Sequence, residues 1–240
     1  MLQIGGARLG CGPCVALVVD RDTALLRNAR DQGVHILEAR IDRFAHLDLL
    51  SVLGEIKGLK KHGLPIIATV RSSSEGGLAD LSPAERLKLY QAVLPWVDAV
   101  DVELASAALV RALGPLLKKA RKPLILSYHH FGHTPPDQFL TERLRRARIL
   151  GAQITKIAVL AKKGDDVLRM YEFTRRHRRK NIITISLGPR GTLSRVLFPT
   201  AGSLIAYTGL IPFDGQIPLR ELVSTLKLLY QSKGARNDSK

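Results

Sequence analysis

Hydrophobic and polar positions follow a repeating pattern along this chain. Short runs rich in Val, Ile and Leu alternate with longer stretches in which apolar residues recur at helical spacing. The short runs are typical of buried strands and the longer stretches of amphipathic helices. Eight strands are predicted, over Val15–Val19, His35–Ile41, Pro65–Val70, Ala99–Glu103, Pro123–Ser127, Gln153–Ala158, Asn181–Ser186 and Ser203–Tyr207.

Helices are predicted between these strands and after the last one. Ser82-Pro83-Ala84-Glu85 has a capping serine, a proline in the first turn and a glutamate three residues after the cap. Gly33, Gly63 and Gly151 stand where helices should end. The predicted helices are Asp22–Gln32, Asp48–His62, Ser82–Val93, Ala107–Ala120, Pro135–Leu150, Asp165–Arg176, Ser194–Phe198 and Pro218–Gln231.

Eight strand–helix units in 240 residues match the count and size of a (β/α)₈ TIM barrel, an α/β fold. The alternative is a doubly wound open sheet, which a glycine-rich dinucleotide fingerprint after the first strand would favour. Val19-Asp20-Arg21-Asp22 contains none. Because no linker or shift in composition interrupts the chain, we predict a single barrel domain over residues 1–232. The polar residues 233–240 are predicted to form a mobile tail.

Composition excludes several classes of protein. Hydrophobic residues make up 45% and charged residues 24%, which argues against a disordered chain. No apolar run approaches the ~18 residues of a membrane span, since the longest, Ala201–Phe213, is followed by Asp214. Met1–Gly10 has no apolar core of the kind a signal peptide needs. We therefore expect a cytoplasmic protein.

The only two cysteines, Cys11 and Cys14, form the sequence C-G-P-C. Such a pair can be a redox motif or half of a metal site. A zinc site would need two more ligands, and the chain has no second C-x-x-C and no H-x-x-x-H. The pair also precedes the first strand instead of opening a helix after one. We interpret the two cysteines as reduced thiols and predict no metal site.

Net charge is +16, from 37 basic and 21 acidic residues. The basic clusters are Lys57–Lys61, Lys118–Lys122, Arg143–Arg148 and Arg175–Lys180. Three of the four fall at ends of predicted helices, where cations complement the helix dipole. Aromatic residues are only 5%, with no stacking platform among the cations. A solvated basic face is therefore favoured over a nucleic-acid site.

Polar residues gather where the barrel prediction expects chemistry. In such barrels the active site lies at the C-terminal ends of the strands. The side chains predicted near these ends are Glu38, Arg40, Arg71, Glu75, Asp101, Glu103, His129, Lys156, Arg195 and Gln216. Each alone could form an ordinary salt bridge, but their concentration at one end of the barrel favours an active site.

Lys156 carries the most specific chemistry. It lies within the apolar run Ile154–Leu160, so it either faces the barrel or reaches solvent from the helix layer. Burial disfavours the charged ammonium, and a neutral lysine attacks carbonyls to form a Schiff base. With His129 as proton carrier and Glu75 or Glu103 to orient it, the set predicts proton abstraction next to an imine. Arg71 and Arg195 would bind an anionic substrate, most simply a carboxylate.

Seven short motifs occur in order on the predicted strands and the loops that follow them. They are Glu38-Ala-Arg40-Ile-Asp42, Thr69-Val-Arg71-Ser-Ser-Ser-Glu75-Gly-Gly, Val100-Asp101-Val-Glu103-Leu, Ser127-Tyr-His129, Thr155-Lys156-Ile-Ala, Ser194-Arg195 and Gly215-Gln216. With these motifs the chain resembles type I 3-dehydroquinate dehydratase, the third enzyme of the shikimate pathway. The resemblance runs from about Val15 to Gln231.

This resemblance implies a TIM barrel that works without metal or cofactor and is often a homodimer. Lys156 would form the Schiff base with the ketone of 3-dehydroquinate. His129 would remove a C2 proton and protonate the leaving C1 hydroxyl, a syn elimination that gives 3-dehydroshikimate. Glu75 would orient this histidine and Arg195 would pair with the substrate carboxylate. The resemblance assigns Glu38, Arg40, Arg71 and Gln216 to the substrate-binding shell, and Asp101 and Glu103 to a supporting acidic pair.

Two positions depart from the family pattern. The family commonly reads His-Asp-Phe where this chain has His129-His130-Phe131, and we expect His130 to alter the pH profile. After the last strand the family commonly carries Ser-Ala-Pro-Gly-Gln. Here the loop is about two residues shorter, with Pro212 in the place of the serine and Asp214 nearby. Because a carboxylate repels an anionic substrate, weaker substrate binding is predicted.

Two other functions stay open at this point. The altered loop leaves room for a Schiff-base barrel of another specificity, such as an aldolase. A catalytically retired barrel that binds nucleic acid through its positive charge would show a steep dependence of affinity on salt.

Overall fold

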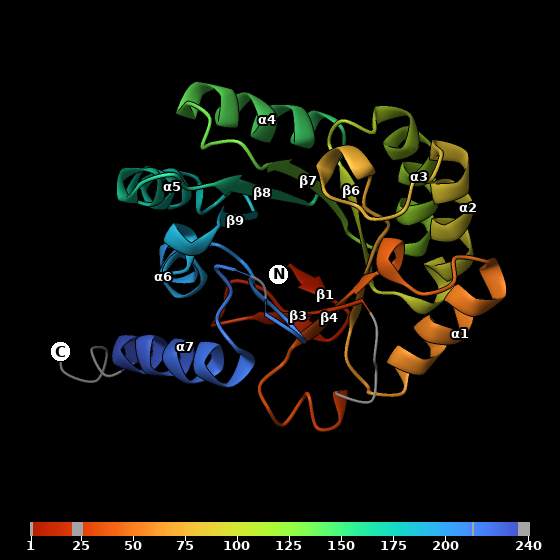
Figure 1. The fold of residues 1–240 in the computed structure, drawn as a ribbon, viewed down its shortest axis with the longest axis horizontal. Coiled ribbons are helices and arrows are strands. Elements are labelled where there is room, and N and C mark those ends of the chain that lie inside the picture. The colour runs from red at the N-terminus through yellow and green to blue at the C-terminus, as the bar shows by residue number, and fades with distance from the viewer. Residues whose placement is uncertain (1, 21–25, 213, 235–240) are drawn as a thin grey trace.

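Eight parallel strands form one sheet that curls into a barrel (Figure 1), as predicted. The computed structural model describes residues 2–20, 26–212 and 214–234. The strands follow the order β10-β3-β4-β5-β6-β7-β8-β9. Their bounds are β3 Val15–Val19, β4 Ile36–Arg40, β5 Ile66–Thr69, β6 Ala99–Glu103, β7 Leu124–His130, β8 Ile154–Leu160, β9 Ile182–Leu187 and β10 Ala206–Gly209.

Loop residues join the two edge strands of this sheet, β9 and β10. The Leu204 amide donates a hydrogen bond of 2.9 Å to the Ile182 carbonyl. Ser203 Oγ accepts one of 3.0 Å from the Thr184 amide. These contacts close the barrel where the described residues form no continuous ladder.

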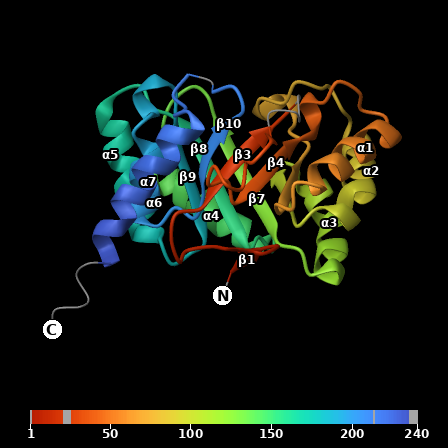
Figure 2. The same cartoon turned by 90° about the horizontal axis from the view of Figure 1, so that it is seen from below.

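Helices surround the strands on the outside of the barrel (Figures 1 and 2). Ser82 and Glu85 form the predicted capping box at the start of α2. The helices are α1 Leu49–Lys60, α2 Pro83–Val93, α3 Ala107–Ala120, α4 Asp137–Ile149, α5 Gly164–His177, α6 Ser194–Ala201 and α7 Leu219–Gly234. Since α7 runs through Gly234, the predicted tail begins inside this helix, and its residues 235–240 lie outside the described residues.

One predicted helix is wrong. Of Asp22–Gln32, residues 22–25 lie outside the described part of the chain, and residues 26–32 form successive tight turns. Asn28 has a φ of 60°, a left-handed conformation that interrupts a right-handed helix. The Gln32 amide then donates to the Asn28 carbonyl at 3.0 Å, which closes one of these turns.

A short N-terminal hairpin, β1 Gln3–Ile4 and β2 Ala7–Arg8, lies at the end of the barrel where the strands begin (Figure 2). Ile4, Ala7 and Leu9 pack into the barrel interior with Ile36, Ile125 and Ile154. This apolar layer closes the floor of the barrel. Two residues further along the strands, the inward positions are polar, because alternate side chains point to the same side of a strand.

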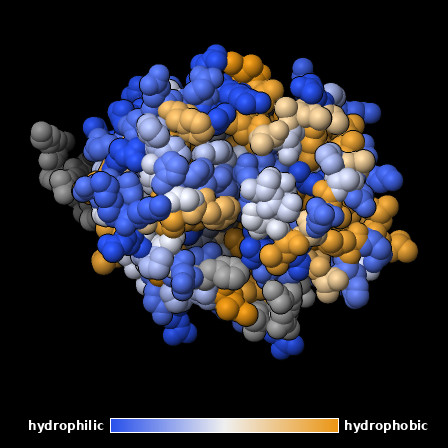
Figure 3. All heavy atoms as spheres, turned by 45° about the horizontal axis from the view of Figure 1, so that its top comes forward, coloured by the Kyte–Doolittle hydropathy of each residue, from blue (hydrophilic) through white to orange (hydrophobic). Residues whose placement is uncertain are grey.

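Outside the barrel, the opposite faces of the strands pack against the helices through a large apolar cluster that includes Leu37, Ile66 and Leu126. Hydrophilic side chains cover most of the face shown in Figure 3, with apolar ones scattered among them. Among the described residues, no helix has the length and apolar character needed to cross a membrane.

Candidate active site

A cavity of about 300 Å³ opens at the C-terminal ends of the strands. It is lined by all eight residues predicted to act in catalysis or substrate binding, namely Glu38, Arg40, Arg71, Glu75, His129, Lys156, Arg195 and Gln216. They come from strands β4, β7 and β8 and from the loops and the helix that follow β5, β9 and β10. The predicted supporting pair, Asp101 and Glu103, lies buried on β6.

Lys156 points into the barrel interior, the first of the two orientations that its sequence left open, and its side chain is 6% exposed. Its Nζ lies 3.1 Å from Glu38 Oε2 and 3.2 Å from Asp101 Oδ2. The ring of Tyr207 lies 4.3 Å from the same atom. Two carboxylates and the face of an aromatic ring are therefore the groups that touch the amine.

Arg71 holds the acidic pair in place below the cavity. It contacts Asp101 at 2.9 Å, Glu103 at 3.3 Å and the Ser127 hydroxyl at 2.5 Å. Burial alone would raise the pKa of Asp101, but Arg71 and Lys156 outweigh it and hold that pKa below its ordinary value. Burial likewise opposes the charge of Arg71, yet Asp101 and Glu103 raise its pKa. Asp101 therefore stays ionised between Arg71 and Lys156.

Glu103 belongs to the support of the site and does not line the cavity. One oxygen accepts a hydrogen bond from the Ser72 amide at 2.8 Å, which ties down the start of the loop after β5. The other pairs with Arg86 of α2. Sequence reasoning did not single out Arg86, although a buried arginine facing a buried glutamate is the expected way to satisfy both charges.

The loop after β5 brings Glu75 to His129. It forms a short 3₁₀ turn, η3 Ser73–Glu75, which ends at Gly76 with a φ of 83°. A side chain on the next glycine, Gly77, would lie 2.1 Å from the Arg71 carbonyl. Only glycine allows the backbone to fold this closely on itself, so the Gly-Gly pair is what aims Glu75 at the cavity.

His129 and Glu75 form a buried pair. Glu75 Oε2 lies 2.9 Å from His129 Nδ1 and accepts a second hydrogen bond, also 2.9 Å, from the His129 amide. Burial, followed by the charges of Arg71 and Lys156, holds the pKa of His129 well below its ordinary value. Burial also raises the pKa of Glu75 to about 7, although Arg71 opposes this shift. His129 is thus kept neutral, the form in which an imidazole can take a proton.

Arg40 is fixed by Asp42, two residues further on. The two form a bidentate pair with distances of 2.9 and 2.8 Å. Asp42 also accepts hydrogen bonds from the amides of Arg71 and Leu78, at 3.0 and 3.3 Å. Sequence reasoning quoted Asp42 within a motif but gave it no role. The structure shows that it orients Arg40 and anchors both ends of the loop that carries Glu75.

Arg195 differs from the other cations of the cavity. Its side chain is buried, and its only hydrogen bond among the described residues runs from Nε to the Gly215 carbonyl at 3.3 Å. No carboxylate in the described part of the chain forms an ion pair with it, and burial lowers its pKa to about 10. A buried cation with no counter-charge is a ready partner for an anionic ligand.

The loop after β10 is held by Gln216, whose Oε1 accepts a hydrogen bond of 3.0 Å from the Gly209 amide. Asp214 lines the cavity, where its carboxylate would repel an anionic substrate. Pro212 does not line it, and Phe213 lies outside the described residues.

His130 does not line the cavity either. Its ring packs edge-on against that of His133 with centroids 4.3 Å apart, and its Nδ1 lies 3.2 Å from the His133 amide nitrogen. His130 therefore packs against His133 and not against the residues of the cavity, and its expected effect on the pH profile stays a prediction.

Tyr207 is the contact of Lys156 that sequence reasoning missed. The predicted last strand ended on this residue, which was given no role. Its position two residues after the inward-facing Ile205 was the signal that could have placed it in the barrel. Among the described residues, no group of three or more His, Cys, Asp or Glu side chains could hold a metal ion.

Comparisons with known proteins agree on one group of relatives. The model of the type I 3-dehydroquinase family matches residues 13–233. A 3-dehydroquinate dehydratase of Thermodesulfovibrio yellowstonii is 33% identical over 222 residues, which cover 90% of this chain and 96% of that protein. The enzyme of the same name from Aquifex aeolicus is 36% identical over 208 residues, covering 86% of this chain and 93% of its own.

Solved structures give the same picture. The type I 3-dehydroquinate dehydratase of Clostridium difficile, solved with covalently modified comenic acid, superposes with a TM-score of 0.90 at 28% identity. The match covers 96% of this chain and 98% of that one. The Aquifex aeolicus structure superposes with a TM-score of 0.81 at 36% identity and covers 91% and 99% of the two chains.

Proposed function

The chain belongs to the type I 3-dehydroquinase family, and from that premise we propose how its own residues carry out the family's reaction. The activity is that of a hydro-lyase, 3-dehydroquinate dehydratase, which removes water from 3-dehydroquinate through a lysine Schiff base and forms 3-dehydroshikimate. The membership favours this function over the aldolase and over the retired barrel. It places the protein in the shikimate pathway, which leads to chorismate and the aromatic amino acids.

Substrate binding rests on Arg195 in this proposal. The substrate carboxylate pairs with this guanidinium, because it is the buried cation of the cavity that has no carboxylate partner among the described residues. Arg40, held by Asp42, and the carboxylate of Glu38 face the same cavity and are placed to bind hydroxyl groups. The substrate ketone then lies against Lys156 at the bottom of the cavity.

Lys156 is the nucleophile. Its ammonium first gives a proton to a neighbouring carboxylate, and Glu38 and Asp101 are within 3.2 Å of Nζ. The free amine adds to the C3 ketone, and loss of water from the adduct leaves a cationic imine. This cation forms where the ammonium stood, between the same two carboxylates and over the ring of Tyr207. The groups that held the resting charge therefore also stabilise the intermediate.

His129 is the base and then the acid. The imine withdraws electrons from C2, so a neutral imidazole is strong enough to remove a C2 proton. The electron pair moves into an enamine, and its return expels the C1 hydroxyl, which takes the proton from His129 and leaves as water. A water molecule then adds to the product imine, and cleavage of the C–N bond releases 3-dehydroshikimate and returns Lys156 to its amine. An ionised Glu75 accepts the Nδ1 proton of His129, which leaves the Nε2 lone pair free to act as the base.

The observation that carries this proposal is the union of a buried lysine and a buried His–Glu pair in one cavity. Incubation of the purified protein with 3-dehydroquinate tests it, with the rise of ultraviolet absorbance of the conjugated enone as the readout. We expect turnover without added metal or cofactor. Turnover of aldol substrates with none of 3-dehydroquinate would support the aldolase instead.

We also propose a homodimer in the cytoplasm. The resemblance to a family of homodimers supports the first part. The second is supported by the cysteine content, since Cys11 and Cys14 are the only two in 240 residues and disulfide-dense chains belong to oxidising compartments. Sedimentation at micromolar concentration should give twice the mass of the chain, and a monomer mass would contradict the dimer.

A further inference from the structure

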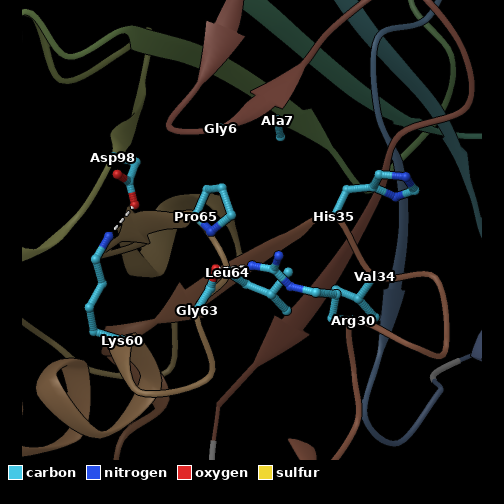
Figure 4. A pocket seen from close by; sticks show the side chains of 10 residues that line it. All are labelled: Gly6, Ala7, Arg30, Val34, His35, Lys60, Gly63, Leu64, Pro65 and Asp98. Atoms are coloured by element: carbon cyan, nitrogen blue, oxygen red, sulfur yellow. Dashed lines mark hydrogen bonds and ion pairs between the residues drawn. The ribbon is translucent and has the colours of Figure 1, made fainter.

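Two hollows mark the other end of the barrel, where the strands begin. The first, about 350 Å³, lies between the N-terminal hairpin and the segment Gly63–Pro65 (Figure 4). Its charges already have partners, because Lys60 pairs with Asp98 at 2.8 Å and Arg30 donates to the Gly63 carbonyl. This hollow therefore offers no free charge to a ligand.

The second hollow is a groove of about 550 Å³ between the C-terminal ends of α3 and α4. Its floor and walls are apolar, with Leu117, Leu124 and Leu150 among the lining side chains. Gly114 adds to the hollow, since a side chain on it would meet nothing within 4 Å. The volume lies in the range of roughly 300–1,000 Å³ that is typical of small-molecule sites.

Free cations stand at the rim of this groove. Lys118 and Arg121 are exposed, and among the described residues neither side chain makes a hydrogen bond or an ion pair. No acidic residue lines the groove. Lys122, the third lining cation, donates to the Leu94 carbonyl.

The positive charge of the side chains at the groove exceeds the partial negative charge of the two helix C-termini. Each helix C-terminus carries roughly half a negative charge. The last turns of α3 and α4 carry Lys118, Lys119, Arg146 and Arg148, and Arg121 follows α3 directly. Of these five cations, Lys118 and Arg121 line the groove. Their two unit charges exceed the two partial charges of the helix ends, so an anion is attracted.

Arg121 itself is unusually placed. It ends α3 with a φ of 54°, in the left-handed conformation that helix ends normally assign to glycine or asparagine. Arg121 thus places a cation beside the groove at a backbone position that normally favours glycine. Beside it, Gln153 is fixed by hydrogen bonds to the Leu124 amide and the Gly151 carbonyl, at 2.7 and 2.8 Å, so this wall is rigid.

We propose that this groove binds a small amphipathic anion, a carboxylate, phosphate or sulfonate carried on an apolar body. The apolar part would lie on Leu117, Leu124 and Leu150, and the anionic group would reach Lys118 and Arg121. The site lies at the opposite end of the barrel from the catalytic cavity. It is separate from the dehydration reaction and does not depend on it.

Titration with 8-anilinonaphthalene-1-sulfonate, an amphipathic anion whose fluorescence rises in apolar sites, tests the inference. Gly114→Leu fills the groove and should weaken the affinity at least tenfold. Gly58→Leu is the matched control, because Gly58 also stands within a helix, α1, and has nothing within 4 Å of an added side chain. The control should change the affinity less than twofold.

A second pair of variants tests the charge. Arg121→Gly removes the cation and suits the left-handed backbone, so the fold is kept while the affinity should fall about fivefold. Lys61→Ala, an exposed cation at the end of α1, is the control and should have no effect. Unchanged binding in Gly114→Leu, or no binding to the unaltered protein, would overturn the inference. Displacement of the probe by equimolar inorganic phosphate would also overturn it, since the apolar body would then be irrelevant.

Discussion

The two ends of this barrel use positive charge in opposite ways. At the C-terminal end, Lys156 and Arg71 are buried, and each lies against two carboxylates. At the N-terminal end, Lys118 and Arg121 are exposed and have no partner among the described residues. Charges are buried in fixed ion pairs at the C-terminal end and lie exposed at the N-terminal end.

This difference follows from the cost of burying a charge. An ion that leaves water needs partners to replace its hydration, so every cation added to the catalytic cavity brings acidic residues with it. Exposed cations at helix ends need none and gain from the helix dipole. The net charge of +16 therefore comes mainly from cations on the outer surface. In the cavity, Arg195 is the exception, because it is buried without a carboxylate partner among the described residues, and we propose that the substrate supplies the missing charge.

Loss of the nucleophile should have the largest effect on activity. Lys156→Ala removes the amine that forms the imine, and kcat should fall by about 10⁴-fold or more. It also leaves Glu38 and Asp101 without their cation. Steady-state assays with 3-dehydroquinate measure the fall, and circular dichroism establishes that the variant is folded. Activity near that of the unaltered protein would show that the buried cation is structural.

Loss of the base should come next. His129→Ala leaves Lys156 able to form the imine but removes the group that takes the C2 proton, so kcat should fall by roughly 10²–10⁴-fold. Because the elimination stalls after the imine, a borohydride-reducible adduct should accumulate on Lys156. Absence of this adduct in a folded variant would mean that His129 acts before imine formation.

Removal of the unpaired cation should act mainly on substrate binding. Arg195→Ala deletes a buried, charge-assisted contact, and KM should rise roughly 10–100-fold with a smaller change in kcat. Asp214→Asn is the opposite control, because it removes a carboxylate from the same cavity and should lower KM. If Asp214→Asn raises KM as Arg195→Ala does, the negative charge of Asp214 does not weaken substrate binding.

The pH dependence should follow Glu75, whose pKa burial raises to about 7. Below this pH the carboxyl is protonated and no longer fixes the tautomer of His129, so kcat should fall about tenfold per pH unit as the pH drops below 7. Glu75→Gln should flatten this acid limb at a lower maximal rate, since the pKa of His129 itself lies well below its ordinary value. An acid limb that stays near pH 7 in the variant would assign it to another group.

The same shift predicts a change of stability. A carboxyl whose pKa is raised from 4.5 to about 7 on folding is bound to its proton more tightly in the folded state. Its contribution is present below about pH 4.5 and is lost as the pH rises through 7, by up to about 3 kcal/mol. Urea unfolding at several pH values should show this loss in the unaltered protein and not in Glu75→Gln.

The smallest effect should come from the other end of the barrel. Lys118→Glu reverses an exposed charge and should leave kcat and KM within a factor of two and the free energy of unfolding within about 0.5 kcal/mol. Steady-state kinetics and urea unfolding measure both. A large fall in activity would show that the charge at this end affects the catalytic cavity and would contradict the independence of the two ends.

The sequence predicted those features that depend on strand periodicity. The apolar run around Lys156 left two orientations open, the barrel interior or the helix layer, and the structure shows the first. Spacing by two residues predicted that Glu38 and Arg40 lie on the same side of their strand. Because parallel strands in a barrel end on one face, the remaining polar strand ends also had to meet there. No pairwise contact was needed for that conclusion.

Contacts between strands could not be predicted in the same way. The partners of Lys156 come from β4, β6 and β10, so they depend on the register of the sheet, which one sequence does not give. Periodicity could have placed Tyr207 in the barrel interior, but its contact with Lys156 depends on this register. The predicted helix over Asp22–Gln32 failed on local grounds, because Asn28 takes a left-handed conformation that periodicity cannot detect.

Reductive trapping on the unaltered protein tests whether Lys156 forms an imine with the substrate. The protein is incubated with 3-dehydroquinate and borohydride, digested and analysed by mass spectrometry. We expect a single adduct, on the peptide that carries Lys156, with the mass of the reduced imine of substrate or product. A folded, active protein that yields no adduct, or an adduct on another lysine, would contradict the account.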